Sequence, residues 1–276
     1  MHAAAFFRCK GMGFSRFCST FAVTINNSNM LHNTKMWLVA CASAAMMLGS
    51  SLTCSAQQAA KPAKAPKDWA KIEKYAAAND SVRRACNSGR RVVFIGNSIT
   101  ELWKRNYPRF WNEHPDYVCR GICGQTSYQF LVRFRQDVID LNPAVVVINA
   151  GTNDVAENTN RYSEDRTVAN IATMAELARL HGIKVILTSV LPASHFSWRP
   201  AITDAAPKIA SLNNRIKALA ESMGCGYVDY YSHLVSGSER SLNPAMTTDG
   251  VHPTEAGYNV MAPLIVKAIT QALSSK

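Results

Sequence analysis

The sequence predicts an α/β fold, a three-layer α/β/α sandwich with a central parallel sheet. The first observation is that short apolar runs rich in valine and isoleucine alternate with longer segments of helical periodicity. The second is that these runs lack the alternating polar residues of a half-exposed strand. Strands buried on both faces are typical of parallel sheets that helices cover. No internal repeat or second domain is evident, so one globular domain is expected after the leader.

Residues 1–56 are interpreted as a leader that contains a secretory signal peptide. Lys35 precedes an apolar run from Trp37 to Leu48, and small residues follow that run as far as Ala56. This order is typical of a signal peptide, and the run is too short to span a bilayer comfortably. We therefore predict cleavage after Ala56 and a secreted or periplasmic protein with no stable membrane insertion.

The position of the apolar run also bears on the start of translation. Signal peptides begin near the initiator methionine, so Met30 or Met36 is the expected start. A genuine amphipathic targeting arm is the alternative, because the residues before Met30 include basic but no acidic side chains. A lipid anchor at Cys54 is less favoured, since Thr53 is larger than the residue that a lipoprotein signal prefers before its cysteine.

A tether and a first helix connect the leader to the sheet. Residues 57–68 are rich in proline, alanine and lysine and are predicted to be a tether, whereas residues 68–85 have helical periodicity. The folded domain is expected to span residues 69–276. Strands are expected at residues 92–96, 117–121, 144–150, 183–190 and 226–230, and further helices at 127–140, 163–182, 205–223 and 255–273.

The helix expected at residues 163–182 has the clearest start and stop signals. Ser163 is placed as its N-cap, Glu164 and Asp165 put negative charge in the first turn, and Gly182 ends it. In the last helix Pro263 is expected to kink or interrupt the backbone, because proline has no N–H to donate.

Charge and cysteine content argue against a nucleic-acid-binding surface and against a zinc site. The formal net charge falls from +11 to +7 without residues 1–56, and the tether lysines account for three more, which leaves about +4. This is too little for the clustered basic face that nucleic-acid binding needs. Outside the leader no Cys/His cluster has zinc spacing, so the remaining thiols are interpreted as buried or incidental. These four cysteines are Cys86, Cys119, Cys123 and Cys225.

The residues that follow the predicted strands point to a function. Ser98 follows the first strand, a glycine turn with Gly124 follows the second, and Asn153 follows the third, while Asp249 and His252 precede the last helix. Each has a purely structural explanation as a helix cap or turn residue. Functional residues of parallel sheets gather at the carboxyl ends of the strands, so their joint appearance there favours an active site.

These stretches resemble the SGNH, or GDSL-type, family of serine esterases over essentially residues 90–270. The resemblance implies the flavodoxin-like SGNH hydrolase fold and makes Ser98, Gly124, Asn153 and His252 the four signature residues. It also implies that the backbone N–H groups of Ser98 and Gly124 and the Asn153 amide form one oxyanion hole. Spacing alone does not establish that shared role.

The chemistry of these residue types agrees with an esterase. A serine hydroxyl becomes a useful nucleophile when a neighbouring base takes its proton, and a histidine suits that task at neutral pH. His252 is the candidate base for Ser98, and Asp249 can hold the imidazole in the correct tautomer. Donors preset around the developing oxyanion complete the catalytic set, so no metal and no organic cofactor are required.

Two residues next to the candidate catalytic residues bear on the proposed chemistry, namely Asn97 and Cys123. The family usually has aspartate before the serine, where this chain has Asn97. The exchange removes a charge beside the nucleophile, so it bears on local hydrogen bonding and on the pH optimum. Cys123, next to Gly124, is an alternative nucleophile, but the strand-tip position and the partner residues favour Ser98.

The resemblance leaves the substrate open among lipids, thioesters, phospholipids and acetylated carbohydrates. The loop at residues 154–165 is polar and no long apolar lid is evident, which favours a small acyl group on a polar scaffold. Trp103, Phe196 and Trp198 are candidate contacts to a sugar, although tryptophans near strand ends often pack in the core.

The sequence therefore predicts a secreted serine esterase that hydrolyses short-chain esters and deacetylates a carbohydrate. An acyl-lipid or lysophospholipid hydrolase of the same fold is the alternative within enzymes. Outside enzymes the alternative is a non-catalytic glycan-binding module, which loss of Ser98, Asn153 or His252 would have indicated.

Overall fold

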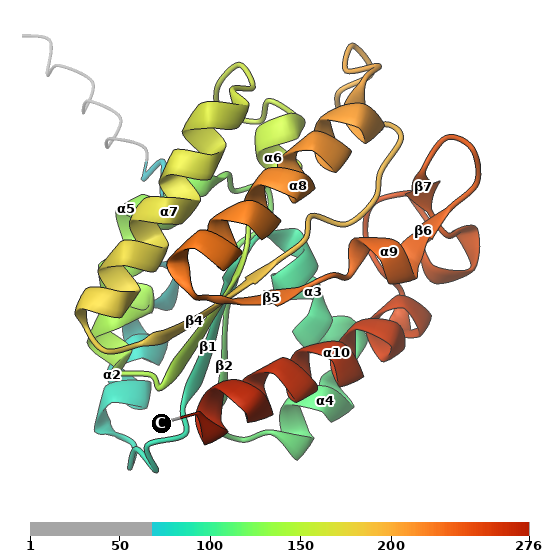
Figure 1. Ribbon diagram of the computed structural model, residues 1–276. Helices are drawn as coiled ribbons and strands as arrows, with labels where there is room; N and C mark the ends of the chain where they lie inside the picture. The colour runs from blue at the N-terminus through green and yellow to red at the C-terminus, as the bar shows by residue number, and fades with distance from the viewer. Residues whose placement is uncertain (1–67, 276) are drawn as a thin grey trace, which may run out of the picture. The chain divides into compact units, whose positions relative to one another are not determined.

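Five parallel strands form the central sheet of the computed structural model, which describes residues 68–275 (Figure 1). Their spatial order is β2-β1-β3-β4-β5, and each neighbouring pair is parallel. The expected leader and all but the last residue of the tether lie outside the described residues. The strands are β1 (Val92–Gly96), β2 (Tyr117–Gly121), β3 (Val145–Asn149), β4 (Lys184–Thr188) and β5 (Gly226–Val228).

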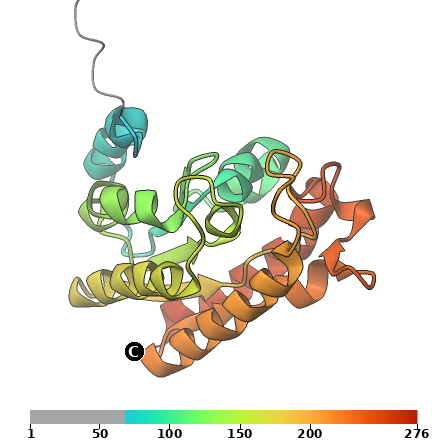
Figure 2. The same ribbon diagram turned by 90° about the horizontal axis from the view of Figure 1, so that it is seen from above.

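Helices cover both faces of this sheet, which confirms the predicted three-layer sandwich (Figures 1 and 2). One face carries α5 (Ser127–Asp137), α7 (Glu164–Leu180) and α8 (Ala205–Met223). The other carries α3 (Ser98–Asn106), α4 (Pro108–Glu113) and α10 (Glu255–Ser274). None of the helices within residues 68–275 is both long enough and apolar enough to cross a membrane.

Strand β1 shows why the apolar runs form strands with two buried faces. Val93 and Ile95 point into the core beneath α5, α7 and α8, whereas Val92 and Phe94 point into the core beneath α3, α4 and α10. All four side chains are at most 2% exposed. Burying each contributes about 1.5 to 3 kcal/mol, so both helical layers are fixed to this inner strand.

Smaller elements complete the described chain. The segment before β1 forms the 3-10 turn η1 (Ile72–Tyr75) and helix α2 (Ala76–Arg84). A two-stranded hairpin lies between β5 and α10, and its strands are too short for the sequence to show a period. The remaining elements are η2 (Ile139–Leu141), α6 (Thr152–Val155), α9 (Tyr231–Leu234), β6 (Val235–Ser236), β7 (Ser241–Leu242) and η3 (Pro244–Met246).

Two expectations about helices are corrected by the structure. Pro263 lies inside α10, which continues through it from Glu255 to Ser274, so the expectation that proline interrupts this helix was wrong. Met261, Ile265 and Ile269 are buried on the face toward the sheet, and this packing offsets the one lost backbone hydrogen bond. The helix expected at residues 127–140 ends at Asp137 and is followed by the 3-10 turn η2.

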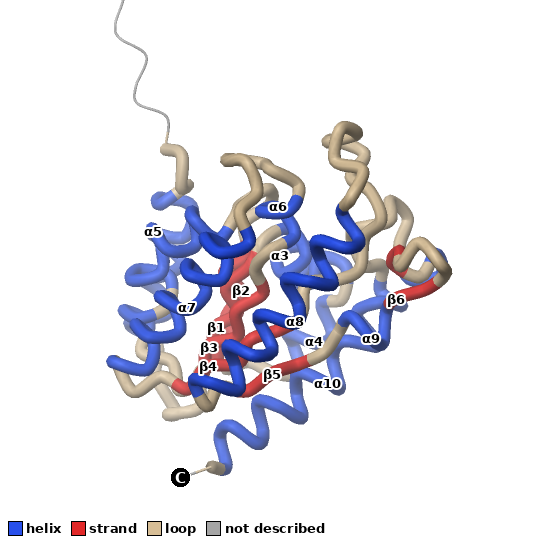
Figure 3. The backbone as a smooth tube through the Cα atoms, turned by 45° about the horizontal axis from the view of Figure 1, so that its top comes forward, coloured by secondary structure: helices blue, strands red, loops and turns tan. Residues whose placement is uncertain are grey.

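The strand order determines where a ligand can bind. The chain leaves β1 for β2 on one side and then returns to place β3 on the other side of β1. A crevice forms outside the carboxyl ends of the strands at such a reversal. Helices α3 and α6 begin there, close together above the ends of β1 and β3 (Figure 3).

Candidate active site

Ser98 is the first residue of α3, directly after the turn that ends β1. The helix is capped by Asn97, whose Oδ1 accepts the Ile99 N–H at 2.9 Å, so Ser98 is not the cap and its hydroxyl is free for another partner. A β-carbon at Gly96 would lie 2.0 Å from Thr100 Oγ1, so the tight turn requires glycine. Asparagine and aspartate cap helices equally well, which explains why the exchange at Asn97 leaves this turn intact.

His252 reaches Ser98 from a loop 154 residues further along the chain, just before α10. Its Nε2 lies 2.8 Å from Ser98 Oγ, and its Nδ1 lies 2.6 Å from Asp249 Oδ2. The other Asp249 oxygen, Oδ1, accepts the backbone N–H groups of Val251 and His252 at 2.9 and 2.8 Å. The structure thus brings together the serine, histidine and aspartate that the sequence singled out, in a continuous chain of hydrogen bonds.

The surroundings of Asp249 keep its carboxylate charged. Partial burial raises the pKa of this group, but the hydrogen bonds from the His252 backbone and ring and from the Val251 N–H outweigh burial. Together they lower the pKa of Asp249 to about 2. At neutral pH Asp249 is therefore an anion that can orient the histidine ring and stabilise its positive charge.

Three hydrogen-bond donors lie around the serine. Asn153 in α6 donates from Nδ2 to the Gln125 carbonyl at 2.9 Å, which leaves one N–H of that amide for a ligand. The backbone N–H groups of Ser98 and Gly124 have no acceptor among residues 68–275. Gly124 has a φ of +80°, a conformation that favours glycine. Donors left free in this way can bind a developing oxyanion.

Asn158 is a residue of the site that sequence reasoning missed. Its Nδ2 donates to Asn153 Oδ1 at 3.0 Å and to the Gly124 carbonyl at 3.1 Å, and its Oδ1 accepts the Trp198 indole N–H at 2.9 Å. It therefore fixes the orientation of the Asn153 amide, with Oδ1 toward Asn158 and Nδ2 toward the Gln125 carbonyl. A lone asparagine in a polar loop gives no sequence signal of this kind.

These residues line one pocket of about 350 Å³. Trp198 forms part of its wall, with 38% of the residue exposed and its ring centroid 6.3 Å from that of His252. Leu102 and Cys123 add apolar surface. The full lining is Ser98, Leu102, Cys123, Gly124, Asn153, Asn158, Trp198 and His252.

Two of the three aromatic residues expected to contact substrate lie elsewhere, so those predictions were wrong. Trp103 is 3% exposed and stacks on Phe110 in the core under α3. A residue five positions after Ser98 points away from the serine's face of the helix, whereas Leu102, four positions after, stays on it. Phe196 is fully buried behind Trp198, with ring centroids 5.2 Å apart, and supports that wall from below.

Cys123 has an environment unsuited to a nucleophile. Burial raises its pKa to about 11, and a hydrogen bond with Glu101 adds to the effect. Glu101 also accepts the Cys123 backbone N–H at 2.6 Å and pairs with Lys74. The reactive form of cysteine is the thiolate, which this environment disfavours at neutral pH. The four cysteines of the described chain are all free thiols.

Known proteins resemble this chain in sequence and in fold. Residues 94–260 match the family described as GDSL-like lipase/acylhydrolase. The crystal structure of a GDSL-like lipase from Bacteroides thetaiotaomicron VPI-5482 is 56% identical. It superposes with a TM-score of 0.72 over 74% of this chain and 98% of its own.

Two curated proteins show more distant similarity. A lipoprotein of Bacillus subtilis (strain 168) is 40% identical over 117 residues, 37% of this chain. An acetylxylan esterase of Xylanibacter ruminicola is 24% identical over 216 residues, 65% of this chain. The matched segments span 48% and 43% of these relatives, less than half of their length.

Proposed function

Because the chain belongs to the GDSL-like lipase/acylhydrolase family, and so to the carboxylic ester hydrolase class, we propose that it cleaves short-chain esters through an acyl-enzyme on Ser98. The observation that carries this proposal is the chain of hydrogen bonds from Ser98 through His252 to Asp249. It supplies a nucleophile, a base and an orienting carboxylate beside a pocket.

In the first half of the reaction the enzyme is acylated. His252 Nε2 takes the Ser98 hydroxyl proton while Oγ bonds to the ester carbonyl carbon, and the carbonyl electron pair moves onto oxygen. The free donors of Ser98, Gly124 and Asn153 stabilise this oxyanion, each contributing about 3 kcal/mol. The intermediate then collapses, the bond to the alcohol oxygen breaks, and His252 returns its proton to that oxygen.

In the second half, water releases the acyl group. His252 removes a proton from water, whose oxygen attacks the acyl carbon in the same pocket. Collapse of this intermediate breaks the bond to Ser98 Oγ and gives the carboxylic acid, while His252 protonates the serine. Asp249, anionic at neutral pH, stabilises the imidazolium in both halves.

For the substrate we propose an acetyl ester on a carbohydrate. The pocket is small, and the Asn153 and Asn158 side chains contribute polar groups to a lining whose exposed surface is mostly apolar. Trp198 offers a partly exposed indole plane beside the histidine, a surface on which a sugar ring can stack. The similarity to an acetylxylan esterase supports the same substrate class.

The proposal is tested with p-nitrophenyl esters from acetate to palmitate, followed by acetylated xylo-oligosaccharides. A steep preference for acetate that Ser98→Ala abolishes, with release of acetate from the oligosaccharide, is expected. A preference for long chains would favour acyl-lipid hydrolysis instead. Binding of the glycan without any hydrolysis would indicate a binding module.

Export of the chain is a further part of the proposal. The signal peptide, cleavage after Ala56 and the Cys54 alternative all fall in residues that the structure does not describe. The similarity to a lipoprotein of Bacillus subtilis supports export and keeps a lipid anchor open as a form of it. Mass spectrometry of the mature amino terminus decides between Gln57 as the first residue and a lipidated Cys54.

A further inference from the structure

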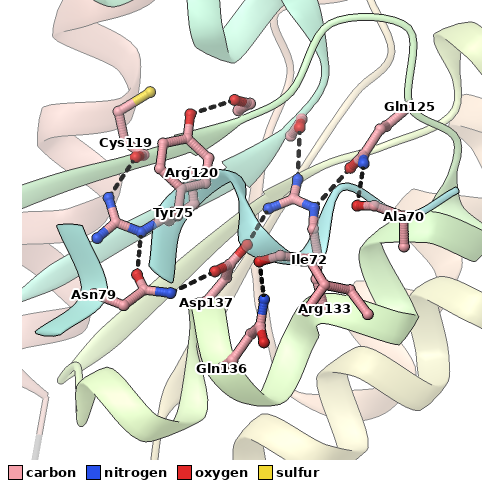
Figure 4. Close-up of polar contacts among 12 residues, drawn as sticks. Ala70, Ile72, Tyr75, Asn79, Cys119, Arg120, Gln125, Arg133, Gln136 and Asp137 are labelled. Carbon is pink, nitrogen blue, oxygen red and sulfur yellow. Dashed lines mark hydrogen bonds and ion pairs between the residues drawn. The ribbon is translucent and has the colours of Figure 1, made fainter. Parts of the chain in front are cut away.

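A buried arginine behind the site takes no part in the proposed mechanism. Arg133 lies in α5 with its side chain fully buried, in the polar cluster drawn in Figure 4. Burial lowers the pKa of its guanidinium, and the Asp137 carboxylate at 2.8 Å opposes that effect. Apolar side chains often replace such a buried pair with no loss of stability. Folding stability alone is therefore a weak reason for an arginine here.

Arg133 contacts both segments that carry the free backbone donors. Its Nη2 donates to the Gly96 carbonyl at 3.1 Å, two residues before Ser98. Its Nε donates to Gln125 Oε1 at 2.7 Å, one residue after Gly124. The guanidinium is planar and its donors have a fixed geometry, so the two bonds fix the serine turn relative to the glycine loop.

Gln125 extends this connection to the third donor. Its backbone carbonyl accepts from Asn153 Nδ2 at 2.9 Å, and Asn153 lines the same pocket as Ser98. Its side-chain Nε2 donates to the Ala70 carbonyl at 2.6 Å, in the segment before η1. Gln125 is 1% exposed, so both polar ends of its side chain are held away from water.

We propose that Arg133 and Gln125 form a positioning pair that sets the geometry of the oxyanion hole. The inference rests on the proposed function, because it concerns how the donors around the acyl oxygen are held. Neither side chain lines the pocket, so both act through the residues that do. A donor displaced by about 1 Å can cost about 100-fold in rate, which makes such positioning measurable.

A second buried arginine provides a matched control. Arg91 lies just before β1, 7% exposed, and donates to the backbone carbonyls of Leu141 and Val82. It is the same kind of residue at the opposite end of the same strand, away from Ser98. Arg133→Met removes only one member of its ion pair and leaves the Asp137 carboxylate buried without its cation, and Arg91→Met leaves two backbone carbonyls without their donor. Loss of folding stability is therefore expected from both variants, whereas loss of kcat is expected only from Arg133→Met.

The test measures kcat, KM and thermal unfolding of the full chain and its variants with p-nitrophenyl acetate. Arg133→Met is expected to lower kcat about 10- to 100-fold and Gln125→Met about 10-fold, with KM changed less than about threefold. Arg91→Met is expected to stay within about twofold of the unmodified kcat. Gln125→Met keeps the Arg133–Asp137 pair, so it decides the question if Arg133→Met does not fold.

Unchanged kcat in Gln125→Met, or equal losses of kcat in Arg133→Met and Arg91→Met, would overturn the positioning role. Ser98→Ala, measured in parallel, separates this result from failure of the proposed function. An active Ser98→Ala shows that hydrolysis does not use this site at all. An inactive Ser98→Ala beside a fully active Gln125→Met overturns the positioning role alone.

Discussion

Two serines at the starts of helices make different contacts in this chain, one as a helix cap and one as the partner of a histidine. Ser163 is the N-cap of α7, and its side chain accepts the Arg166 N–H at 3.4 Å. Ser98 stands one position later at the start of α3, because Asn97 caps that helix. Its hydroxyl lies 2.8 Å from His252 instead. A shift of one residue relative to the cap thus changes a serine from a structural group into a candidate nucleophile.

The largest expected effect comes from removing the hydroxyl of Ser98. Ser98→Ala is predicted to lower kcat for p-nitrophenyl acetate by about 10³-fold or more, because no other described group offers an activated nucleophile in the pocket. Its thermal unfolding is expected to stay near that of the unmodified protein, since Asn97 still caps the helix. Retained activity would show that Ser98 is not the nucleophile, so that the two serines would not differ in function.

Asp249→Asn is expected to have the next largest effect on rate. The asparagine Oδ1 can still accept the Val251 and His252 N–H groups, but its amide cannot accept the His252 Nδ1 proton or carry negative charge. We predict a kcat lower by about 10²- to 10⁴-fold with the loop intact. Steady-state kinetics with p-nitrophenyl acetate measure it, and a variant as fast as the parent would show that the histidine needs no carboxylate.

Trp198→Ala is expected to act on binding more than on chemistry. Loss of the stacking surface predicts a KM about 10-fold higher for acetylated xylo-oligosaccharides, with kcat for p-nitrophenyl acetate within about threefold of the parent. Trp69, 47% exposed and outside the pocket, supplies the control substitution Trp69→Ala. Equal KM values for both variants would argue against sugar contact at Trp198.

Ser163→Ala tests the serine that serves as a helix cap. Loss of an N-cap hydrogen bond is predicted to lower the free energy of unfolding by about 1 kcal/mol, measured by urea denaturation. The esterase rate is expected to remain unchanged, because α7 contributes no residue to the pocket. A loss of rate in the folded Ser163→Ala protein would mean that the two serines differ less than their contacts indicate.

The smallest expected effect is the contribution of Asp249 to acid stability. Its pKa of about 2 in the folded protein is below its ordinary value of 3.8, so its contribution is present above about pH 4 and lost as the pH falls toward 2. The group is half exposed, which limits the effect to less than about 1 kcal/mol. Asp249→Asn should therefore lose less stability than the parent between pH 4 and 2, and parallel profiles would contradict this.

The fold and the polar residues of the site could be predicted from the sequence for one physical reason. Buried parallel strands are apolar on both faces, as β1 is and as β3 is up to Asn149 at its end, and their carboxyl ends meet at one edge. The short segments that follow the carboxyl ends of the strands could therefore be predicted from the sequence to contain the site residues. Ser98, Gly124 and Asn153 all lie on the pocket for that reason.

The remaining parts of the site depend on packing that local sequence does not specify. Trp103 in α3 and Phe196 in the loop after β4 lie in the core, whereas Trp198, two residues after Phe196, is partly exposed on the pocket. Asn158 and Arg133 act through contacts to distant segments, to Gly124 and to Gly96. Asn158 is one polar residue in a polar loop and Arg133 is one arginine in a helix, so neither periodicity nor spacing in the sequence predicts these partners.

Acylation of Ser98 is measured directly by mass spectrometry of the protein quenched during turnover of p-nitrophenyl acetate. We expect one acetyl group per chain on the peptide that contains Ser98 and none in Ser98→Ala. The acetylated fraction is expected to rise at low pH, where deacylation is slowed. An acetyl group on the peptide that contains Cys123, or full turnover with no covalent intermediate trapped under any condition, would contradict acylation of Ser98.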